Sequence, residues 1–228
     1  MMGRRRRGDA SHDRRPNAWS LVGLTLALIG PGAVALLSDQ PAGTSFTLAT
    51  SLPLLALFAT LAAAVVAIAV VGESLRWRDV GFGHVSWRSL VSAVGLALVL
   101  ILAVGPVVAW MVTEIGGGGF AGGEARLAAL PVWYVCLTIV VVAGGEEWLY
   151  RGYALERLEA LTGNRWLAAV ISLLAFAAAH IPMWGIGPAL TTLVSGGVMT
   201  AFYLWRRDIL ALILAHVATD LYGLVIAR

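Results

Sequence analysis

Long apolar segments separated by short polar loops constrain this chain more than any other feature. Seven such segments cover residues 18–37, 46–71, 89–113, 127–161, 166–181, 187–205 and 209–227. A membrane-spanning helix needs about 20 mostly apolar residues, and within a bilayer only helices and closed barrels satisfy every backbone hydrogen bond. The sequence therefore predicts an all-α, polytopic transmembrane helix bundle of about seven spans. An eighth span or a re-entrant turn near residues 182–188 would change this count.

The composition agrees with a membrane protein and argues against several other classes. The 228 residues are 59% hydrophobic and 13% charged, whereas soluble domains have about 25% charged residues. Seven spans leave no room for a large soluble domain. The single cysteine, Cys136, excludes an intramolecular disulfide and a Cys-rich zinc site. We expect membrane lipid as a partner and no nucleic acid. The net charge of +3 is explained by the enrichment of basic residues in the cytoplasmic loops of membrane proteins.

The basic residues predict the orientation. Arginines cluster in residues 1–17, 72–88, 151–165 and 206–207, which fall on alternate loops of a seven-span chain, and only Arg126 and Arg228 fall on the other side. Because cytoplasmic loops are enriched in basic residues, we expect a cytoplasmic N-terminus and an external C-terminus. Residues 1–17 are expected to be a disordered, Arg-rich cytoplasmic tail on anionic lipid headgroups. The run 18–37 is longer than the apolar core of a signal peptide, so we interpret it as the first span.

Few ionisable residues remain inside the predicted spans, and their spacing is informative. They are Glu146, Glu147, Arg151, His180, His216 and Asp220. A charge at the bilayer centre costs at least ~2.5–3.5 kcal/mol, so such groups are usually paired and functional. Glu147 and Arg151 are four residues apart and share a helix face, which favours an ion pair. Glu146 then points elsewhere, while His216 and Asp220 share a face of their own.

Depth places these groups together. Glu146 and His180 each lie seventeen residues from Gly163, the expected turn of a helical hairpin. They should therefore sit at matching heights on neighbouring helices, and His216 lies roughly 13 Å beyond Arg207 at ~1.5 Å per residue. The hairpin tip carries four charged residues between 156 and 165. If that tip protrudes into the cytoplasm, the three groups share one depth and open to the cytoplasmic side.

A carboxylate beside two imidazoles suits the activation of water for amide hydrolysis. Glu146 could act as general base, with a divalent metal such as zinc held by His180, His216 and Glu146 to acidify the water. Alternatively, His180 could position the water while His216 and Asp220 stabilise the oxyanion. The rival hypotheses are a non-enzymatic immunity or scaffold protein, in which these groups join helices, and a proton-coupled transporter.

Three motifs resemble those of the CAAX-protease and bacteriocin-processing (CPBP, or Abi) family of intramembrane proteases. They are Glu146-Glu147-x-x-x-Arg151, Phe176-x-x-x-His180 and His216-x-x-x-Asp220, together with the basic Trp205-Arg206-Arg207 turn before the third. The resemblance covers about residues 125–228, which we expect to be the catalytic helix bundle, and leaves residues 18–124 as N-terminal transmembrane helices.

The resemblance implies a glutamate- or metal-dependent endopeptidase in the cell membrane. Its catalytic residues would be Glu146, Glu147, Arg151, His180, His216 and Asp220, with the first glutamate of the motif as the base. Its substrate would be a membrane-associated protein or peptide. Relatives end the third motif in Asn or Asp, and the Asp at position 220 favours the metal scheme slightly, because it could ligate a metal or orient His216.

Overall fold

The computed structural model describes residues 16–37, 46–83, 86–115, 127 and 129–226. Within these ranges every regular element is a helix, and seven helical segments are long and apolar enough to cross a membrane. The predicted all-α, seven-span bundle is confirmed. The Arg-rich segment 1–15 and the boundary between residues 124 and 125 lie outside the described residues, so the tail and the domain division stay predictions.

Fourteen of the fifteen elements in the described residues belong to the seven spans. The first three spans are α1 (Ala18–Leu37), α2 (Leu48–Ala67) with the π-helix η1 (Ile68–Gly72), and α3 (Trp87–Val99) with the π-helix η3 (Leu100–Val104) and α4 (Gly105–Ile115). A short 3₁₀ helix, η2 (Trp77–Val80), lies between the second and third spans. The last four spans are α6 (Val132–Glu147) with the π-helix η4 (Trp148–Leu155) and α7 (Glu156–Thr162); α8 (Arg165–Ala179) with α9 (Ile181–Trp184); α10 (Ile186–Arg206); and α11 (Ile209–Leu221) with the π-helix η5 (Tyr222–Ile226).

Prolines account for the two boundaries that sequence reasoning misplaced. The fourth span begins at Val132 and not near residue 127, because the residue before Pro131 is disfavoured in helical conformation. The fifth span does not end at Pro182. That proline sits in the first turn of α9, where its missing N–H is tolerated, and the span continues to Trp184. Gly185, with φ of +87°, ends it.

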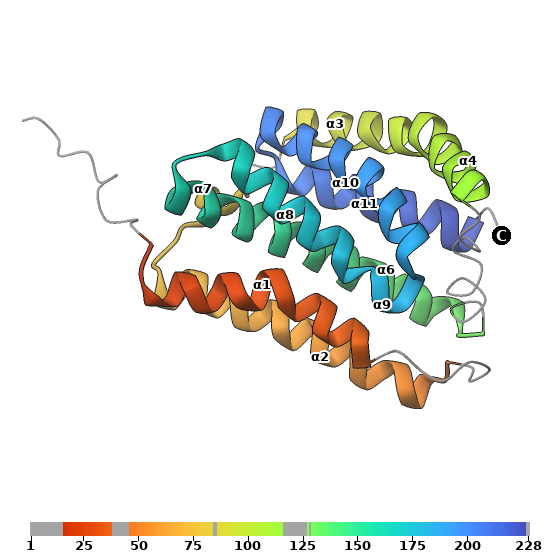
Figure 1. Ribbon diagram of the computed structural model, residues 1–228, viewed down its shortest axis with the longest axis horizontal. Coiled ribbons are helices and arrows are strands. Elements are labelled where there is room, and N and C mark those ends of the chain that lie inside the picture. Colours follow the sequence, from red (N-terminus) through yellow and green to blue (C-terminus); the bar gives the residue numbers. More distant parts are fainter. Residues whose placement is uncertain (1–15, 38–45, 84–85, 116–126, 128, 227–228) are drawn as a thin grey trace, which may run out of the picture.

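A π turn precedes Pro106 in the third span. η3 lies directly before Gly105 and Pro106, and a widened turn relieves the clash between a proline ring and the carbonyl four residues earlier. Figure 1 shows α4 descending away from the line of α3. The third span is therefore bent at about its middle, close to the cavity described below.

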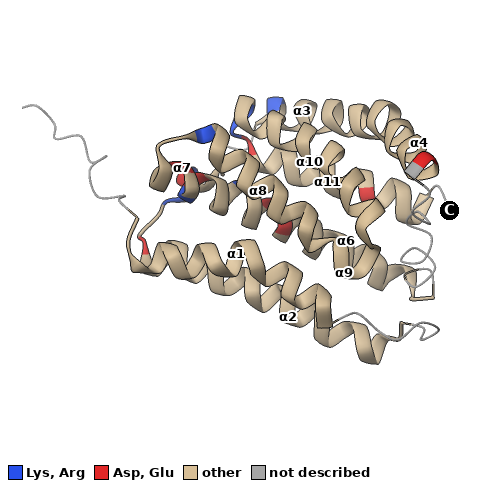
Figure 2. Ribbon diagram, viewed as in Figure 1, with Lys and Arg blue, Asp and Glu red and all other residues tan. Residues whose placement is uncertain are grey.

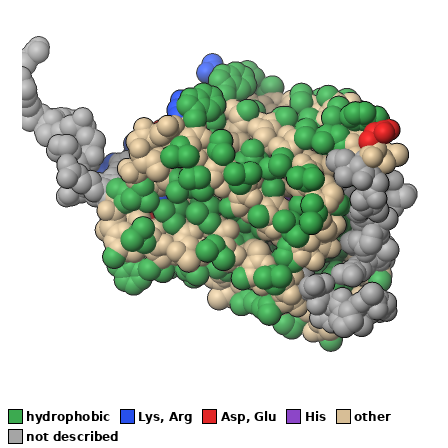
Figure 3. All heavy atoms as spheres, in the orientation of Figure 1, with side chains coloured by type: hydrophobic (Ala, Val, Ile, Leu, Met, Phe, Trp, Pro, Cys, Tyr) green, Lys and Arg blue, Asp and Glu red, His purple; other side chains and the backbone are tan. Residues whose placement is uncertain are grey.

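The helices form three tiers around η4. Figure 1 shows α1 and α2 as one tier, α6 and α8 in the middle, and α3, α10 and α11 on the far side. Every residue of η4 is buried, and this element contacts α1, α7 and α8. Apolar side chains cover much of the flank seen in Figure 3, which is the surface that lipid tails would contact.

Charged residues gather at the α7 end of the bundle (Figure 2). There the buried Glu73 carboxylate accepts hydrogen bonds from Ser20, Tyr153 and Arg157, the last at 3.4 Å. Arg207 pairs with Glu156, and with Glu159 at 2.5 Å. Sequence reasoning assigned no ion-pair partners to these groups, whereas in the structure they form ion pairs that join several helices.

Two further features fix this end. Burial acts to lower the pKa of Arg207, but the neighbouring Glu156 and Glu159 carboxylates outweigh it and hold that pKa above its ordinary value. The backbone N–H of Ile209 donates to the Gly81 carbonyl at 3.1 Å. Gly81 has φ of +86°, and a Cβ there would lie 2.6 Å from the Tyr203 hydroxyl. Only glycine fits this position, and the loop it belongs to anchors the start of α11.

Candidate active site

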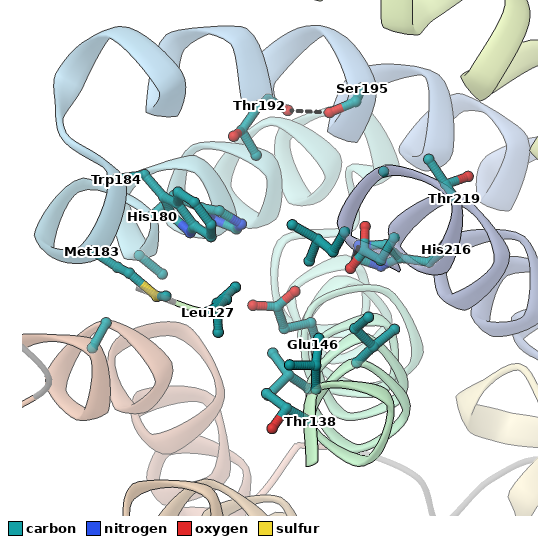
Figure 4. A pocket seen from close by; sticks show the side chains of 18 of the residues that line it. Leu127, Thr138, Glu146, His180, Met183, Trp184, Thr192, Ser195, His216 and Thr219 are labelled. Atoms are coloured by element: carbon teal, nitrogen blue, oxygen red, sulfur yellow. Dashed lines mark hydrogen bonds and ion pairs between the residues drawn. The ribbon is translucent and has the colours of Figure 1, made fainter. Parts of the chain in front are cut away.

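Three helices present the ionisable groups to one space. Glu146 and Glu147 end α6, His180 follows the last residue of α8, and His216 lies in the middle of α11. Figure 4 shows Glu146 projecting into the space between His180 and His216. Glu146, His180, His216 and Asp220 all line the same cavity. The sequence expectation that these groups share a depth therefore agrees with the structure.

Glu147 contacts two partners at once. Its Oε1 accepts a hydrogen bond from Arg151 at 2.9 Å and lies 2.8 Å from His216 Nδ1. Glu147 and Arg151 are both fully buried. The expected pair of Glu147 with Arg151 is present, and the contact with His216 goes beyond it. Glu147 therefore links the ion pair to the imidazole and does more than neutralise the arginine.

Sequence reasoning missed the helix that holds Arg151 on its other side. The guanidinium donates to the Gly196 carbonyl at 3.2 Å and to Thr200 Oγ1 at 3.4 Å, both on α10. It also lies 4.1 Å from the ring centroid of Phe176, a cation–π distance. α10 has no ionisable residue at these positions, and its only signal is the small-residue stretch around Gly196, which permits a close approach between helices.

The hydrogen bond of His180 Nδ1 fixes the tautomer of this imidazole. Nδ1 lies 2.8 Å from the Phe176 carbonyl oxygen. A carbonyl can only accept, so Nδ1 must carry the proton, and Nε2 is left with a lone pair. The Phe176 ring packs edge-on against this imidazole, with 4.7 Å between centroids. The fixed tautomer suits a group that accepts a hydrogen bond from water.

His216 lies between two carboxylates. Its Nδ1 faces Glu147, and its Nε2 lies 3.6 Å from Asp220 Oδ2, one turn further along α11. The distance to Asp220 is longer than a normal hydrogen bond, so Asp220 acts on the His216 ring through its charge and does not fix its orientation. Glu147 is the group that orients the ring.

As they lie, these residues are not grouped as three ligands of one divalent metal ion. His180 and His216 each use Nδ1 for a contact with the Phe176 carbonyl or with Glu147, which leaves Nε2 as the one nitrogen on each ring that could bind a metal. Within the described residues no group of three or more His, Cys, Asp or Glu side chains is arranged to hold a metal ion. The metal expected on His180, His216 and Glu146 stays a prediction, and no reaction step is assigned to it.

The cavity around Glu146 is large and mostly apolar. Its volume is about 840 Å³, within the range of small-molecule and cofactor sites. Apolar side chains, which come from α1, α2, η3, α4, α6, α9 and η5 among other segments, form most of its wall. The ionisable lining residues are Glu146, His180, His216 and Asp220. An apolar ligand could therefore bind in the cavity with its one polar bond next to these groups.

Comparison with known families gave one match. Residues 128–222 match the family model described as type II CAAX prenyl endopeptidase, Rce1-like. This interval contains all six ionisable residues above and excludes the first three spans. Neither the curated proteins nor the solved structures gave a match. The family resemblance drawn from the three motifs is confirmed.

Proposed function

Because residues 128–222 form a region of the Rce1-like, type II CAAX prenyl endopeptidase family, we propose that this multi-pass membrane protein hydrolyses a peptide bond with Glu146 as the general base. The family supports an intramembrane protease. The observation that carries the finer assignment is the convergence of Glu146, His180 and His216 on one cavity wall. A carboxylate with two imidazoles in a water-restricted site is suited to activating water.

The proposed reaction uses the chain's own side chains. Glu146 takes one proton from water as the oxygen attacks the scissile carbonyl carbon, and the remaining O–H of that water donates a hydrogen bond to His180 Nε2 and stays on the oxygen. His216 Nε2, which at 3.6 Å lies beyond hydrogen-bond distance of Asp220, donates a hydrogen bond to the developing oxyanion and stabilises it. When the tetrahedral intermediate collapses, the carbon–nitrogen bond breaks and Glu146 returns its proton to the leaving amine.

Glu147 and Arg151 act on His216 and not on the substrate. Glu147 Oε1 holds His216 Nδ1, which fixes the ring orientation in the way that a carboxylate fixes a catalytic histidine in hydrolytic triads. Arg151 balances the charge of Glu147 and ties it to α10 through Gly196 and Thr200. We assign both residues to positioning.

The apolar cavity supports a membrane-associated peptide or protein as substrate. Its wall would remove apolar surface of the substrate from water or lipid, at about 25 cal/mol per Å² if it comes from water. A soluble polar peptide would gain little there.

The experiment compares new protein N-termini in membranes from cells that express the wild type or the Glu146→Gln variant. Removing a general base lowers the rate about 10²–10⁴-fold, so termini present with the wild type should vanish with the variant. The matched control is Glu114→Gln, because Glu114 is exposed on α4 and does not line the cavity. Identical termini from wild type and Glu146→Gln, at equal folded yield, would overturn the mechanism.

A non-enzymatic role has one observation in its favour. Arg151 joins η4 to α6 and α10 through buried hydrogen bonds, which is how polar residues hold membrane helices together. In that case Glu146→Gln and Glu114→Gln would give the same termini as the wild type. Metal analysis of the purified protein separates the metal scheme from the scheme above, because the former requires stoichiometric metal.

A further inference from the structure

A second group of polar side chains lines the apolar cavity, more than two helical turns from Glu146. Ser51 of α2 and Tyr134 and Thr138 of α6 all belong to the cavity wall. Ser51 and Tyr134 are only 8% and 2% exposed. Because α2 packs against α6, residues far apart in the sequence meet here. These three residues are called the hydroxyl cluster below.

Two hydroxyls of the cluster lack hydrogen-bond partners. Within the described residues, Ser51 Oγ and Thr138 Oγ1 are buried and form no hydrogen bond. Other helical threonines behave differently: Thr25, Thr60 and Thr219 each donate to the carbonyl four residues earlier. A buried hydroxyl without a partner costs ~1–3 kcal/mol, so the exception at the cavity wall needs a reason.

The Tyr134 phenol lies beside both of these hydroxyls. Its nearest polar side chains are those of Thr138 and Ser51. A hydroxyl can donate one hydrogen and accept two. When Ser51 and Thr138 donate to the phenol oxygen, Tyr134 keeps its own O–H to donate to a group in the cavity. The cluster is therefore complete only when a hydrogen-bond acceptor binds next to Tyr134.

The surroundings favour a neutral acceptor. Among the described residues, no arginine or lysine lines this cavity. An anion beside Tyr134 would have no cation to balance it, and burying an unpaired charge costs far more than burying a carbonyl oxygen. A carbonyl oxygen in an otherwise apolar chain needs only the donor that Tyr134 supplies.

Helix geometry gives the distance from the cluster to the reacting bond. Figure 4 shows Thr138 and Glu146 projecting from the same helix. Thr138 and Tyr134 precede Glu146 by eight and twelve residues, which corresponds to ~12–18 Å at ~1.5 Å per residue. An extended peptide advances ~3.3 Å per residue. A carbonyl bound at the cluster therefore lies about four to five residues from a bond cleaved at Glu146.

We propose that Tyr134, supported by Ser51 and Thr138, binds a peptide carbonyl of the substrate about four to five residues from the scissile bond. The substrate is then a polypeptide that lies extended in the cavity, with apolar side chains around that carbonyl. This inference rests on the proposed endopeptidase function. It also gives α2 a part in substrate binding, because Ser51 lies outside the residues 128–222 that match the family.

The first measurement compares KM and kcat on one peptide that contains a cleavage site found by the comparison of N-termini. Tyr134→Phe removes one hydroxyl with little change of shape. It should raise KM about three- to tenfold, the net value of one hydrogen bond, and leave kcat within about twofold, because binding and not chemistry is altered. Thr138→Val should raise KM by about twofold or more, since it acts through Tyr134.

The matched control is Thr60→Val. Thr60 is exposed on α2, donates to the Ala56 carbonyl and does not line the cavity. Its KM should equal that of the wild type. Thr138→Val guards against a Tyr134→Phe protein that fails to fold, and folding is checked by gel filtration in detergent.

The second measurement locates the carbonyl. In a series of peptides, one peptide group at a time is replaced by a trans-alkene, which keeps the extended shape and removes the carbonyl oxygen. One replacement, about four to five residues from the scissile bond, should raise the wild-type KM about three- to tenfold. The same replacement should change the KM of Tyr134→Phe by less than about twofold, because the two changes remove the same hydrogen bond.

Three results would overturn the proposal: an unchanged KM in Tyr134→Phe, an equal rise in Thr60→Val, or a peptide series in which no replacement is coupled to Tyr134. The last result would assign the phenol to a lipid ester carbonyl or to water. If wild type and Glu146→Gln give identical N-termini, the endopeptidase function fails and the subsite fails with it. Cleavage that depends on Glu146 without coupling to Tyr134 removes the subsite alone.

Discussion

The buried Glu147 carboxylate is shared by a guanidinium and an imidazole, and this sharing is the central residue-level feature of the site. Arg151 and His216 both reach Oε1, at 2.9 and 2.8 Å. Taking away one member of a buried ion pair leaves an uncompensated charge and typically costs 3–5 kcal/mol, whereas replacing both with apolar groups can be nearly neutral. The ion pair should therefore behave as a unit.

A double-mutant cycle tests this. We expect Glu147→Ala and Arg151→Leu each to lower the free energy of unfolding by about 3–5 kcal/mol, and the double variant to be less destabilised than the sum of the two. Chemical denaturation in detergent micelles measures the three values. Additive effects would show that the two charges do not depend on each other.

Asp220 gives a second residue-level prediction. Because it lies 3.6 Å from His216 Nε2, Asp220→Asn should keep the ring in place and lower the cleavage rate by less than about tenfold. Glu146→Gln should lower it by about 10²–10⁴-fold. Rates are compared on one substrate found by the comparison of N-termini. A loss with Asp220→Asn as large as that with Glu146→Gln would make Asp220 a member of the reacting group.

At the scale of elements, adjacent glycines on α6 meet different environments. A Cβ on Gly145 would lie 2.6 Å from the Phe58 ring of α2, whereas a Cβ on Gly144 would lie 3.8 Å from Ile213 of α11. α2 therefore packs closely on α6 beside Glu146. There is no room for a methyl group between Gly145 and Phe58, whereas there is room between Gly144 and Ile213.

We expect Gly145→Ala to lower stability by about 1–3 kcal/mol, the usual cost of overpacking a core, and to reduce cleavage because it displaces the helix end that carries Glu146. Gly144→Ala is the matched control and should stay within about 0.5 kcal/mol of the wild type. Thermal unfolding in detergent gives both values. Phe58→Leu, which shortens the side chain, should restore part of the loss in the Gly145→Ala background.

Sequence periodicity and length predicted most elements, and local chemistry explains the rest. The first span, residues 18–37, coincides with α1, because an apolar run between polar ends leaves little choice of boundary. The π turns of η4 were not predicted, since apolar patterning does not separate a π turn from an α turn. Residue spacing predicted that Glu146 and His180 lie close together and that Glu147 pairs with Arg151. It could not predict that α10 binds Arg151, because that contact joins residues far apart in the sequence.

At the scale of the whole molecule, the seven candidate spans of the described residues predict that the two ends of the chain lie on opposite sides of the membrane. Because basic residues favour cytoplasmic loops, we expect the α7 end to face the cytoplasm, so a fusion at Met1 should face the cytoplasm and a fusion at Arg228 should face the other side. Green fluorescent protein at the first position should fluoresce, and alkaline phosphatase at the second should be active. Exchanging the two reporters should silence both. Activity of phosphatase joined at Met1 would reverse the orientation expected from the arginines.

The hydrogen bond between Ile209 N–H and the Gly81 carbonyl has a consequence for how this sequence can change through evolution. His216 lies seven residues, about two helical turns, after Ile209. The loop around Gly81 therefore helps to fix the position of His216 along the axis of α11. Insertions and deletions in that loop should be selected against although it lies far from Glu146. Length variation among descendants should accumulate instead near Gly163, where a side chain would meet open space.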